Sequence, residues 1–237
     1  MILDERPKCA LAVFAHPDDP EVACAGTLQT WSAAGTDVHL VIANAGDKGS
    51  DERGTDPRAL QARREDEARR AADVLGIGAI DFLGHPDGAL ENDGALRAEL
   101  IARIRAVRPE VVIAPDPTAV FFGDSYVNHH DHRALGWAVL DVAGSMAGGA
   151  LYEPDAGAPH QVATLLLAGT LEPDTWVDVE GALDAKLTAL QCHESRIRVG
   201  EAVLRELVEA RAADAGRQSG VAGVRYAEGF RRLSFRA

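Results

Sequence analysis

The chain is poor in cysteine, and its three cysteines stand apart from one another. Cys9, Cys24 and Cys192 are odd in number and form no C-x-x-C pair among the 237 residues. Scattered cysteines of this kind indicate neither a disulfide framework nor a thiolate zinc site. We therefore expect reduced thiols in a cytoplasmic protein.

Long apolar runs are also lacking. No stretch approaches the ~20 residues that a membrane-spanning helix needs, and residues 1–8 contain no hydrophobic signal core. We expect no membrane as a partner.

Basic residues are few compared with acidic ones. The chain has 24 Lys and Arg against 37 Asp and Glu, which gives a formal net charge of −13. A non-specific nucleic-acid binder needs a basic surface to displace counterions, so this balance argues against nucleic acid as a partner. The sequence also lacks a Pro/Gly/Ser linker and any repeat, and its length suits one large domain over residues 1–237.

What the sequence does contain is a regular alternation of apolar, strand-like segments and helix-like segments. The strands are predicted at residues 10–15, 38–43, 79–83, 110–114, 162–168 and 176–179. The helices are predicted at residues 26–34, 57–75, 96–107, 132–142, 182–192 and 200–213. This alternation predicts an α/β fold, a single Rossmann-like domain with a mostly parallel sheet and helices on both faces.

Two segments between these elements are rich in small residues. Residues 144–159 contain many Ala, Gly and Pro, which predicts a long loop or a lid-like segment. Residues 44–49 are Gly-rich but lack a full phosphate-loop pattern, so we expect a plain turn there.

The sequence His16-Pro17-Asp18-Asp19 directly follows the apolar run of the first predicted strand. Such a segment can be an ordinary turn, since Asp and Pro are common turn residues. It can also be a metal site, because a strand end places the imidazole and carboxylates at the sheet edge where α/β enzymes hold their active sites. Both interpretations are open from these four residues alone.

A second cluster, His129-His130-Asp131-His132, favours the metal site. It lies beyond the strand predicted at residues 110–114, at the same edge of the sheet. Catalytic zinc usually has three protein ligands and one open position for water, and His16, Asp19 and one histidine of the second cluster supply that set.

The remaining carboxylate of the first cluster, Asp18, is then free to act as a base. It can take a proton from a metal-bound water that attacks a carbonyl. A second histidine beside the metal, oriented by an aspartate, can stabilise the resulting oxyanion.

Several motifs share an order and a spacing that are similar to those of a known family. They are His16-Pro17-Asp18-Asp19-Pro20-Glu21 with Gly26-Thr27-Leu28, His129-His130-Asp131-His132, and Arg64 and Glu67 before Leu75-Gly76. Weaker matches are Gly46-Asp47, Asp87-Gly88, Lys186 with His193-Glu194-Ser195, and residues 226–230. Nearly end to end, the chain resembles the PIG-L/LmbE family of metal-dependent N-deacetylases, which remove acetyl groups from N-acetylglucosamine-type substrates.

The resemblance implies His16, Asp19 and His132 as metal ligands and Asp18 as the general base. Taken from the residues alone, His130 stays open as the ligand in place of His132. The implied ion is Zn²⁺, with Fe²⁺ also open, because two imidazoles and a carboxylate suit both.

The resemblance also implies roles for residues around the ion. His129 would stabilise the oxyanion or protonate the leaving amine, and Asp131 would tune His129. Arg64 and Asp87 correspond to positions that hold sugar hydroxyls, because Arg can donate several hydrogen bonds and Asp can accept them from a diol.

Two positions depart from the common family pattern. Pro20 stands where many members carry Glu, although Glu21 follows it, and His130 replaces a common Pro. The loop before the second cluster contains Phe121-Phe122 and Tyr126, and we hypothesise that it shapes the mouth of the pocket.

The expected function is zinc-dependent hydrolysis of an N-acetyl amide on an amino sugar or a related small molecule. One alternative is an amidase that acts on a larger thiol or glycoside conjugate. Another, of a different class, is a non-catalytic metal- or nucleotide-binding Rossmann-like protein. The missing glycine fingerprint and the spare Asp18 carboxylate argue against this alternative. The resemblance also implies a homo-oligomer, whose size no sequence feature sets.

Overall fold

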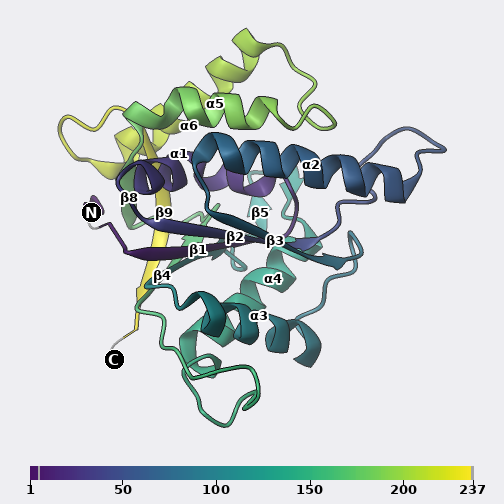
Figure 1. Cartoon of the computed structure of the whole chain (residues 1–237). Coiled ribbons are helices and arrows are strands. Elements are labelled where there is room, and N and C mark those ends of the chain that lie inside the picture. Colours follow the sequence, from purple (N-terminus) through teal and green to yellow (C-terminus); the bar gives the residue numbers. More distant parts are fainter. Residues whose placement is uncertain (5, 236–237) are drawn as a thin grey trace.

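The computed structural model describes residues 1–4 and 6–235 (Figure 1). Its strands are β1 (Cys9–Phe14), β2 (Asp37–Asn44), β3 (Ala79–His85), β4 (Val111–Pro115), β5 (Phe121–Phe122), β6 (Tyr126–Val127), β7 (Thr164–Ala168), β8 (Thr175–Asp178) and β9 (Ala227–Ser234). Its α-helices are α1 (Asp19–Ala33), α2 (Pro57–Leu75), α3 (Gly94–Val107), α4 (His130–Asp141), α5 (Leu183–Gln191) and α6 (Glu201–Ser219).

Seven of these strands form one sheet in the order β3-β2-β1-β4-β7-β9-β8. Every pairing from β3 to β7 is parallel, and β9 runs antiparallel to both of its neighbours. The chain proceeds outward in one direction from β1 to β3 and in the other direction from β4. The strand order therefore reverses between β1 and β4, which is where open α/β sheets form a ligand-binding crevice.

Side chains alternate across the sheet and build two separate cores. In β1, Ala10, Ala12 and Phe14 pack with residues of α1, α2, α5 and α6, whereas Leu11 and Val13 pack with residues of α3 and α4. This alternation is expected of a strand that is buried on both faces. Figure 1 shows the two helical layers on opposite sides of the sheet, and the α/β fold class is confirmed.

Helix α2 shows how local sequence sets the ends of an element. The Asp56 side chain accepts a hydrogen bond from the backbone N–H of Arg58 at 3.0 Å, and Pro57 occupies the first turn. Gly76 ends the helix in the left-handed conformation, with φ 69°. An Asp cap, an early Pro and a terminal Gly are strong helix boundary signals, and the predicted range 57–75 is confirmed.

The structure also differs from the sequence prediction in several elements. The last strand, β9, was not predicted, because residues 227–234 mix Gly and Arg with apolar residues and do not form an apolar run. The segment around Phe121 and Tyr126 was predicted as a loop but forms the small hairpin β5-β6. Helix α1 begins at Asp19 and not at residue 26, and α6 continues to Ser219 and not to residue 213.

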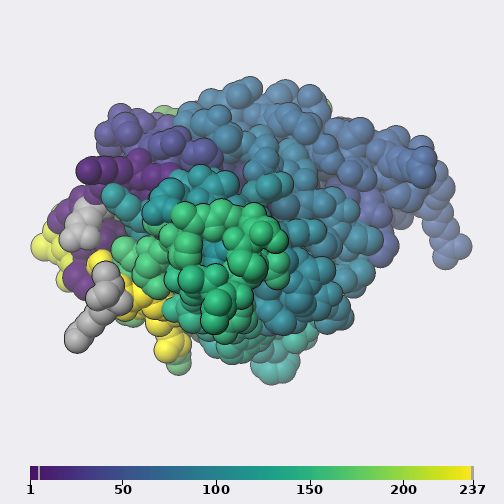
Figure 2. Space-filling model, turned by 60° about the horizontal axis from the view of Figure 1, so that its bottom comes forward, coloured from purple at the N-terminus to yellow at the C-terminus, as the bar shows by residue number. Residues whose placement is uncertain are grey.

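The loop predicted at residues 144–159 follows a short π-helical turn, Val142–Met146, and is tied to helix α3. The buried Arg105 guanidinium donates hydrogen bonds to the carbonyls of Ala147, Gly149, Tyr152 and Glu153 at 2.6–3.1 Å. Figure 2 shows this green segment on the face that comes forward there. None of its described residues lines the cavities at the sheet edge that are discussed below, so the lid-like interpretation is not supported.

No helix within residues 1–4 and 6–235 has the length and apolar character required to cross a membrane. The three cysteines are all free, as their spacing predicts.

Helix α1 is broken at Cys24, whose φ of −151° and ψ of 19° are not helical. The helix resumes with Gly26 and Thr27, whose backbone N–H groups donate to the Glu228 carboxylate at 3.0 and 2.7 Å. Glu228 also pairs with the buried Lys186 at 2.6 Å, and Lys186 donates to the carbonyl of Val22 just before the break. One buried ion pair from α5 and β9 therefore satisfies the backbone on both sides of the break.

We predict that Glu228→Ala lowers the free energy of unfolding by roughly 3–5 kcal/mol, because it leaves a buried Lys186 charge without its partner. Chemical denaturation monitored by circular dichroism measures this loss. Glu172→Gln is the matched control, since Glu172 pairs with Arg231 at the surface and exposed ion pairs contribute little. Equal stability of the two variants would contradict the role assigned to Glu228.

Candidate metal centre and active site

Two histidines and one aspartate meet at the sheet edge between β1 and β4. His16 lies in the turn after β1, Asp19 is the first residue of α1, and His132 lies in the first turn of α4. The His16 Nδ1, His132 Nε2 and Asp19 Oδ2 atoms are 3.0–3.1 Å from one another. We call these three residues the ligand triangle.

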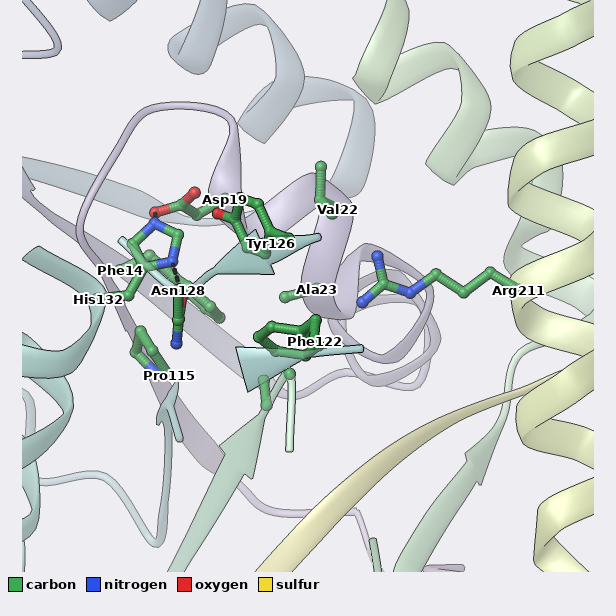
Figure 3. A pocket seen from close by; sticks show the side chains of 12 residues that line it. Phe14, Asp19, Val22, Ala23, Pro115, Phe122, Tyr126, Asn128, His132 and Arg211 are labelled. Carbon is green, nitrogen blue, oxygen red and sulfur yellow. Dashed lines mark hydrogen bonds and ion pairs between the residues drawn. The ribbon is translucent and has the colours of Figure 1, made fainter. Parts of the chain in front are cut away.

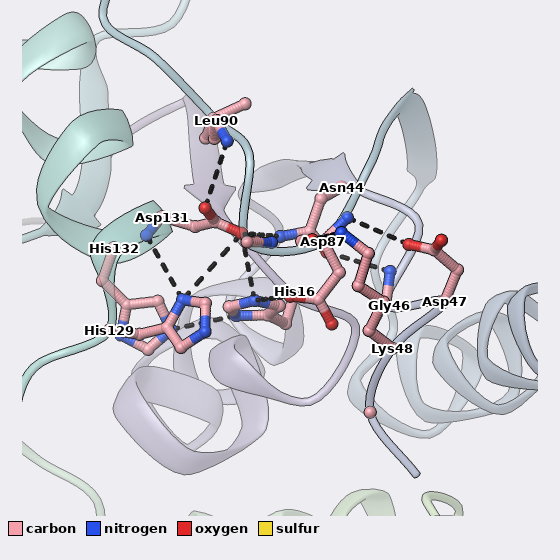
Figure 4. Close-up of polar contacts among 12 residues, drawn as sticks. His16, Asn44, Gly46, Asp47, Lys48, Asp87, Leu90, His129, Asp131 and His132 are labelled. Carbon is pink, nitrogen blue, oxygen red and sulfur yellow. Dashed lines mark hydrogen bonds and ion pairs between the residues drawn. The ribbon is translucent and has the colours of Figure 1, made fainter. Parts of the chain in front are cut away.

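Each imidazole of the ligand triangle has an acceptor against its other nitrogen. The His16 Nε2 lies 3.2 Å from Asp87 Oδ1 and 3.5 Å from Asp131 Oδ2, and the His132 Nδ1 lies 3.0 Å from Asn128 Oδ1. Figure 4 shows His16 close to Asp87, Asp131 and His132. Such outer acceptors hold a proton on the ring nitrogen that faces them. The other ring nitrogen then directs its lone pair to the centre of the triangle.

The charges around His16 favour a positive charge at this point. Burial acts to lower the pKa of His16, but hydrogen bonds to Asp131, Asp19 and Asp87 outweigh it and raise that pKa to about 12. Burial likewise acts to raise the pKa of Asp19, yet the charges and hydrogen bonds of His132 and His16 hold it well below its usual range. The cluster therefore stabilises a cation among its carboxylates.

The ligand triangle fits a divalent metal ion in its donor atoms and its spacing. Two imidazole nitrogens and one carboxylate oxygen are ligands of zinc and iron alike. Ligand atoms bound about 2.0–2.2 Å from one ion lie roughly 3.0–3.5 Å apart, which matches the distances within the triangle. These residues can thus hold one ion without rearrangement.

Asp18 lies beside the ligand triangle but is not part of it. Its Oδ1 accepts a 2.6 Å hydrogen bond from Arg64 Nη2, and Arg196 Nε lies 3.7 Å from its Oδ2. Arg64 is only 2% exposed and also donates to the carbonyl of Gly46 at 3.0 Å. This arrangement holds the Asp18 carboxylate in one orientation at the rim of the site.

The Gly-rich loop after β2 makes room for that guanidinium. A Cβ atom at Gly46 or Gly49 would collide with Arg64 Nη1, and Gly46 also has a left-handed φ of 61°. The glycines of this loop therefore leave space for the Arg64 guanidinium.

His129 is the N-cap residue of α4. Its Nδ1 accepts the backbone N–H of Asp131 at 3.2 Å, and its ring lies edge-on to His16 with centroids 4.6 Å apart. Burial and then the charge of His16 lower the pKa of His129. The neutral ring, with Nδ1 as an acceptor, carries its proton on Nε2.

Asp131 is fully buried and bound by several groups at once. Its carboxylate accepts hydrogen bonds from Asn44 Nδ2 at 2.9 Å and from the backbone N–H groups of Gly88 and Leu90 at 2.8 and 3.2 Å. Burial acts to raise the pKa of Asp131, but His16 and these N–H groups lower it to about 2. The nearer imidazole is that of His16, since His129 Nδ1 is 3.9 Å away.

His130, the alternative ligand, lies outside the ligand triangle. Its side chain is 46% exposed, and its Nε2 is 3.6 Å from Glu91 Oε1. His130 begins α4 and His132 lies two residues further along the helix, so the two side chains point in different directions.

Asp87, predicted to bind a sugar hydroxyl, lies against His16 at the wall of the site. Burial acts to raise its pKa, but the hydrogen bond and charge of His16 outweigh this effect and lower it. Lys48 Nζ donates to the Asp87 carbonyl at 2.5 Å, and Asp47 accepts the Asp87 N–H at 2.9 Å. Asp87 is thus held in place by the Gly-rich loop after β2.

Several residues of the site were not found from the sequence. Asn128 and Asn44 are single amides, and no spacing marks them as partners of His132 and Asp131. Arg196 approaches Asp18 because the preceding Ser195 is bound to the buried Glu67 through both its N–H and its hydroxyl, at 3.0 and 2.5 Å. The Arg64/Glu67 pair of α2 was a detectable signal, because the two residues lie one turn apart on the same face.

His193 is fully buried, and its Nε2 lies 3.1 Å from Glu21 Oε2 in α1. It lies just beyond the end of α5, where its burial excludes a surface histidine. Burial raises the pKa of Glu21, and the neighbouring His193 partly offsets this effect.

Two cavities meet at the ligand triangle. A polar cavity of about 450 Å³ is lined by Asp18, Lys48, Arg64, Asp87, His129 and Arg196. A largely apolar cavity of about 580 Å³ lies on the other side, toward Phe122 and α6 (Figure 3). Asp19, Tyr126 and His132 line both cavities, so a reacting group at the triangle can extend into either one.

The chain is similar to known deacetylases over most of its length. The profile of the PIG-L family, described as GlcNAc-PI de-N-acetylase, matches residues 11–143. The diacetylchitobiose deacetylase of Thermococcus kodakarensis is 31% identical over 233 residues, covering 94% of this chain and 82% of its own. The 1D-myo-inositol 2-acetamido-2-deoxy-alpha-D-glucopyranoside deacetylase of Rhodococcus jostii is 30% identical over 247 residues, covering 80% and 82%.

A solved structure with a similar fold is that of the N,N'-diacetylchitobiose deacetylase from Pyrococcus horikoshii in complex with an inhibitor. It superposes with a TM-score of 0.86 at 26% sequence identity, and the match covers 96% of this chain and 84% of that one.

We predict that His132→Ala loses the bound ion, because it removes one of three ligands, whereas His130→Ala retains it. Metal content per chain, measured by inductively coupled plasma mass spectrometry after zinc reconstitution and gel filtration, distinguishes the two variants. One ion per chain in His132→Ala and none in His130→Ala would reverse the assignment.

Proposed function

The chain belongs to the PIG-L family of GlcNAc-PI de-N-acetylases, and from this premise we propose that it hydrolyses the N-acetyl amide of an amino sugar with zinc as its metal ion. Its deacetylase relatives confirm the enzymatic interpretation of the sequence over the non-catalytic one. The observation that carries the proposal is the position of Asp18, whose carboxylate lines the polar cavity beside the ligand triangle while Asp19 belongs to the triangle.

A divalent ion held by His16, Asp19 and His132 would supply positive charge that lowers the pKa of a water molecule and polarises the amide carbonyl. Zinc suits this donor set and the need for an open position beside three protein ligands.

In this proposal Asp18 is the group that moves the proton. It takes a proton from the attacking water and delivers it to the amide nitrogen as the carbon–nitrogen bond breaks. Arg64 holds Asp18 Oδ1 at 2.6 Å, so the other carboxylate oxygen can face the water. Arg64 thereby acts as a positioning residue in addition to the predicted contact with sugar hydroxyls.

His129 would stabilise the oxyanion that forms on the carbonyl oxygen. Because its Nδ1 accepts the Asp131 N–H, its Nε2–H is the donor available to the substrate. A preorganised donor at the point where negative charge develops contributes strongly to the rate. Asp131 assists in two ways, since its carboxylate lies 3.5 Å from His16 Nε2 and its backbone N–H donates to His129 Nδ1.

The sugar would occupy the polar cavity. Asp87 offers hydrogen-bond acceptors at the wall of that cavity, and Lys48 and Arg196 offer donors beside it. A diol with adjacent hydroxyls suits this mixture of donors and acceptors. A larger thiol or glycoside conjugate is compatible with the same chemistry, since a second cavity of about 580 Å³ also reaches the ligand triangle.

We predict that Asp18→Asn keeps a full complement of zinc but lowers kcat for N-acetylglucosamine hydrolysis by about 10²–10⁴-fold, because general-base catalysis contributes this much. Released acetate, measured on protein of known metal content, gives the rate. Asp81→Asn is the matched control, because Asp81 pairs with Arg103 at the surface. Normal turnover by Asp18→Asn would refute the mechanism, and failure of the wild-type protein on a panel of N-acetylated sugars would refute the function.

A further inference from the structure

The apolar cavity beside the ligand triangle has no role in the mechanism above. Its walls include Phe14, Val22, Ala23, Phe122 and Pro115, and its volume is about 580 Å³. An acetyl group carries only one methyl group and would leave most of this space empty.

Arg211 of α6 bounds the cavity opposite the ligand triangle. Figure 3 shows its guanidinium pointing from α6 toward Ala23 and Phe122, with Asp19 and His132 on the opposite side. Within residues 1–4 and 6–235, Arg211 makes no hydrogen bond or ion pair. Asp214, three residues along α6, is bound instead to Arg217 and Gln218 at 3.1 and 2.8 Å.

Within the described ranges, no carboxylate lies within ion-pair distance of this guanidinium. Asp19, the only acidic residue among the described residues that line the cavity, is held by His16 and His132. Arg211 also lines an adjacent cavity of about 380 Å³, where Glu228 is paired with Lys186. The apolar cavity thus ends at the exposed guanidinium of Arg211, which has no ion-pair partner among the described residues and can pair with the anionic end of a ligand.

The position of Asp18 decides which half of the substrate enters this cavity. The proton from Asp18 must reach the amide nitrogen, and Asp18 lines the polar cavity but not the apolar one. The amine half of the amide therefore lies in the polar cavity. The acyl half, on the other side of the carbonyl carbon, is directed toward Tyr126 and Phe122.

We propose that the apolar cavity receives the acyl group of the substrate, and that the preferred acyl group is longer than acetyl and ends in a carboxylate that pairs with Arg211. The substrate class is the N-monoacyl derivative of a dicarboxylic acid on an amino sugar. Water adds its hydroxyl to the amide carbon and its remaining proton to the nitrogen, which releases the free amino sugar and the dicarboxylic acid. This inference rests on the proposed amide hydrolysis.

The experiment uses zinc-loaded protein and glucosamine carrying one of four N-acyl groups, namely acetyl, hexanoyl, glutaryl and adipoyl. All four substrates release glucosamine, so measuring its free amine gives kcat/KM values that can be compared directly. For the wild-type protein, kcat/KM should be about 10-fold or more higher for glutaryl or adipoyl than for acetyl, because a hydrogen-bonded charge pair contributes about this much to binding. Added salt should raise KM for the carboxylated substrates and not for hexanoyl, because salt screens the pair.

Two variants test the two halves of the proposal. Arg211→Gln should lower the ratio of glutaryl to acetyl kcat/KM by about 10-fold, while Arg217→Gln, on the same helix and already paired with Asp214, should leave it unchanged. Phe122→Ala should lower kcat/KM for hexanoyl more than for acetyl, because it removes part of the apolar wall.

The outcomes separate this inference from the function beneath it. Cleavage of acetylglucosamine alone, or an equal ratio in Arg211→Gln and Arg217→Gln, overturns the acyl-group proposal and leaves the deacetylase function standing. Failure to cleave any of the four substrates overturns both.

Discussion

The candidate site depends on one buried imidazole, that of His16, which lies between carboxylates on both sides. Its Nδ1 faces Asp19 and its Nε2 faces Asp87 and Asp131. Burying three carboxylates together is unfavourable unless positive charge compensates them. A cation therefore stabilises the contact among the first turns of α1 and α4 and the loop after β3, whether it is a charged imidazole or a metal ion in the ligand triangle.

Much of the fold follows from local sequence signals. Helix α2 begins at an Asp-Pro pair and ends at a Gly, and the buried strands β1, β2 and β4 are apolar runs that need no distant partner to be recognised. Strand β9 contains Gly229 and two arginines and is a strand because β7 and β8 pair with it on either side. Its pairing partners lie far away in the sequence, so no local pattern predicts it.

The same distinction applies to the site. The two His/Asp clusters could be found because they follow strands whose carboxyl ends meet at one edge of the sheet, and the structure brings their predicted residues together. Asn128, Asn44 and Arg196 could not be found in this way, since each supplies one contact that depends on loop geometry. Arg64 was expected to contact substrate, and only the structure shows that Gly46 and Gly49 leave space for it to reach Asp18.

The break in α1 links the beginning of the chain to a strand near residue 230. Asp19 is in the first turn of α1. After the break at Cys24, the first backbone N–H groups of the resumed helix donate hydrogen bonds to the carboxylate of Glu228 in β9. During synthesis the first His/Asp cluster emerges from the ribosome long before Glu228, which binds the second part of α1. Helix α1 therefore cannot reach its final geometry until β9 has been made. The sheet edge that carries the candidate site is thus completed late in folding, and a nascent chain that ends before β9 carries both histidine clusters without a properly supported α1.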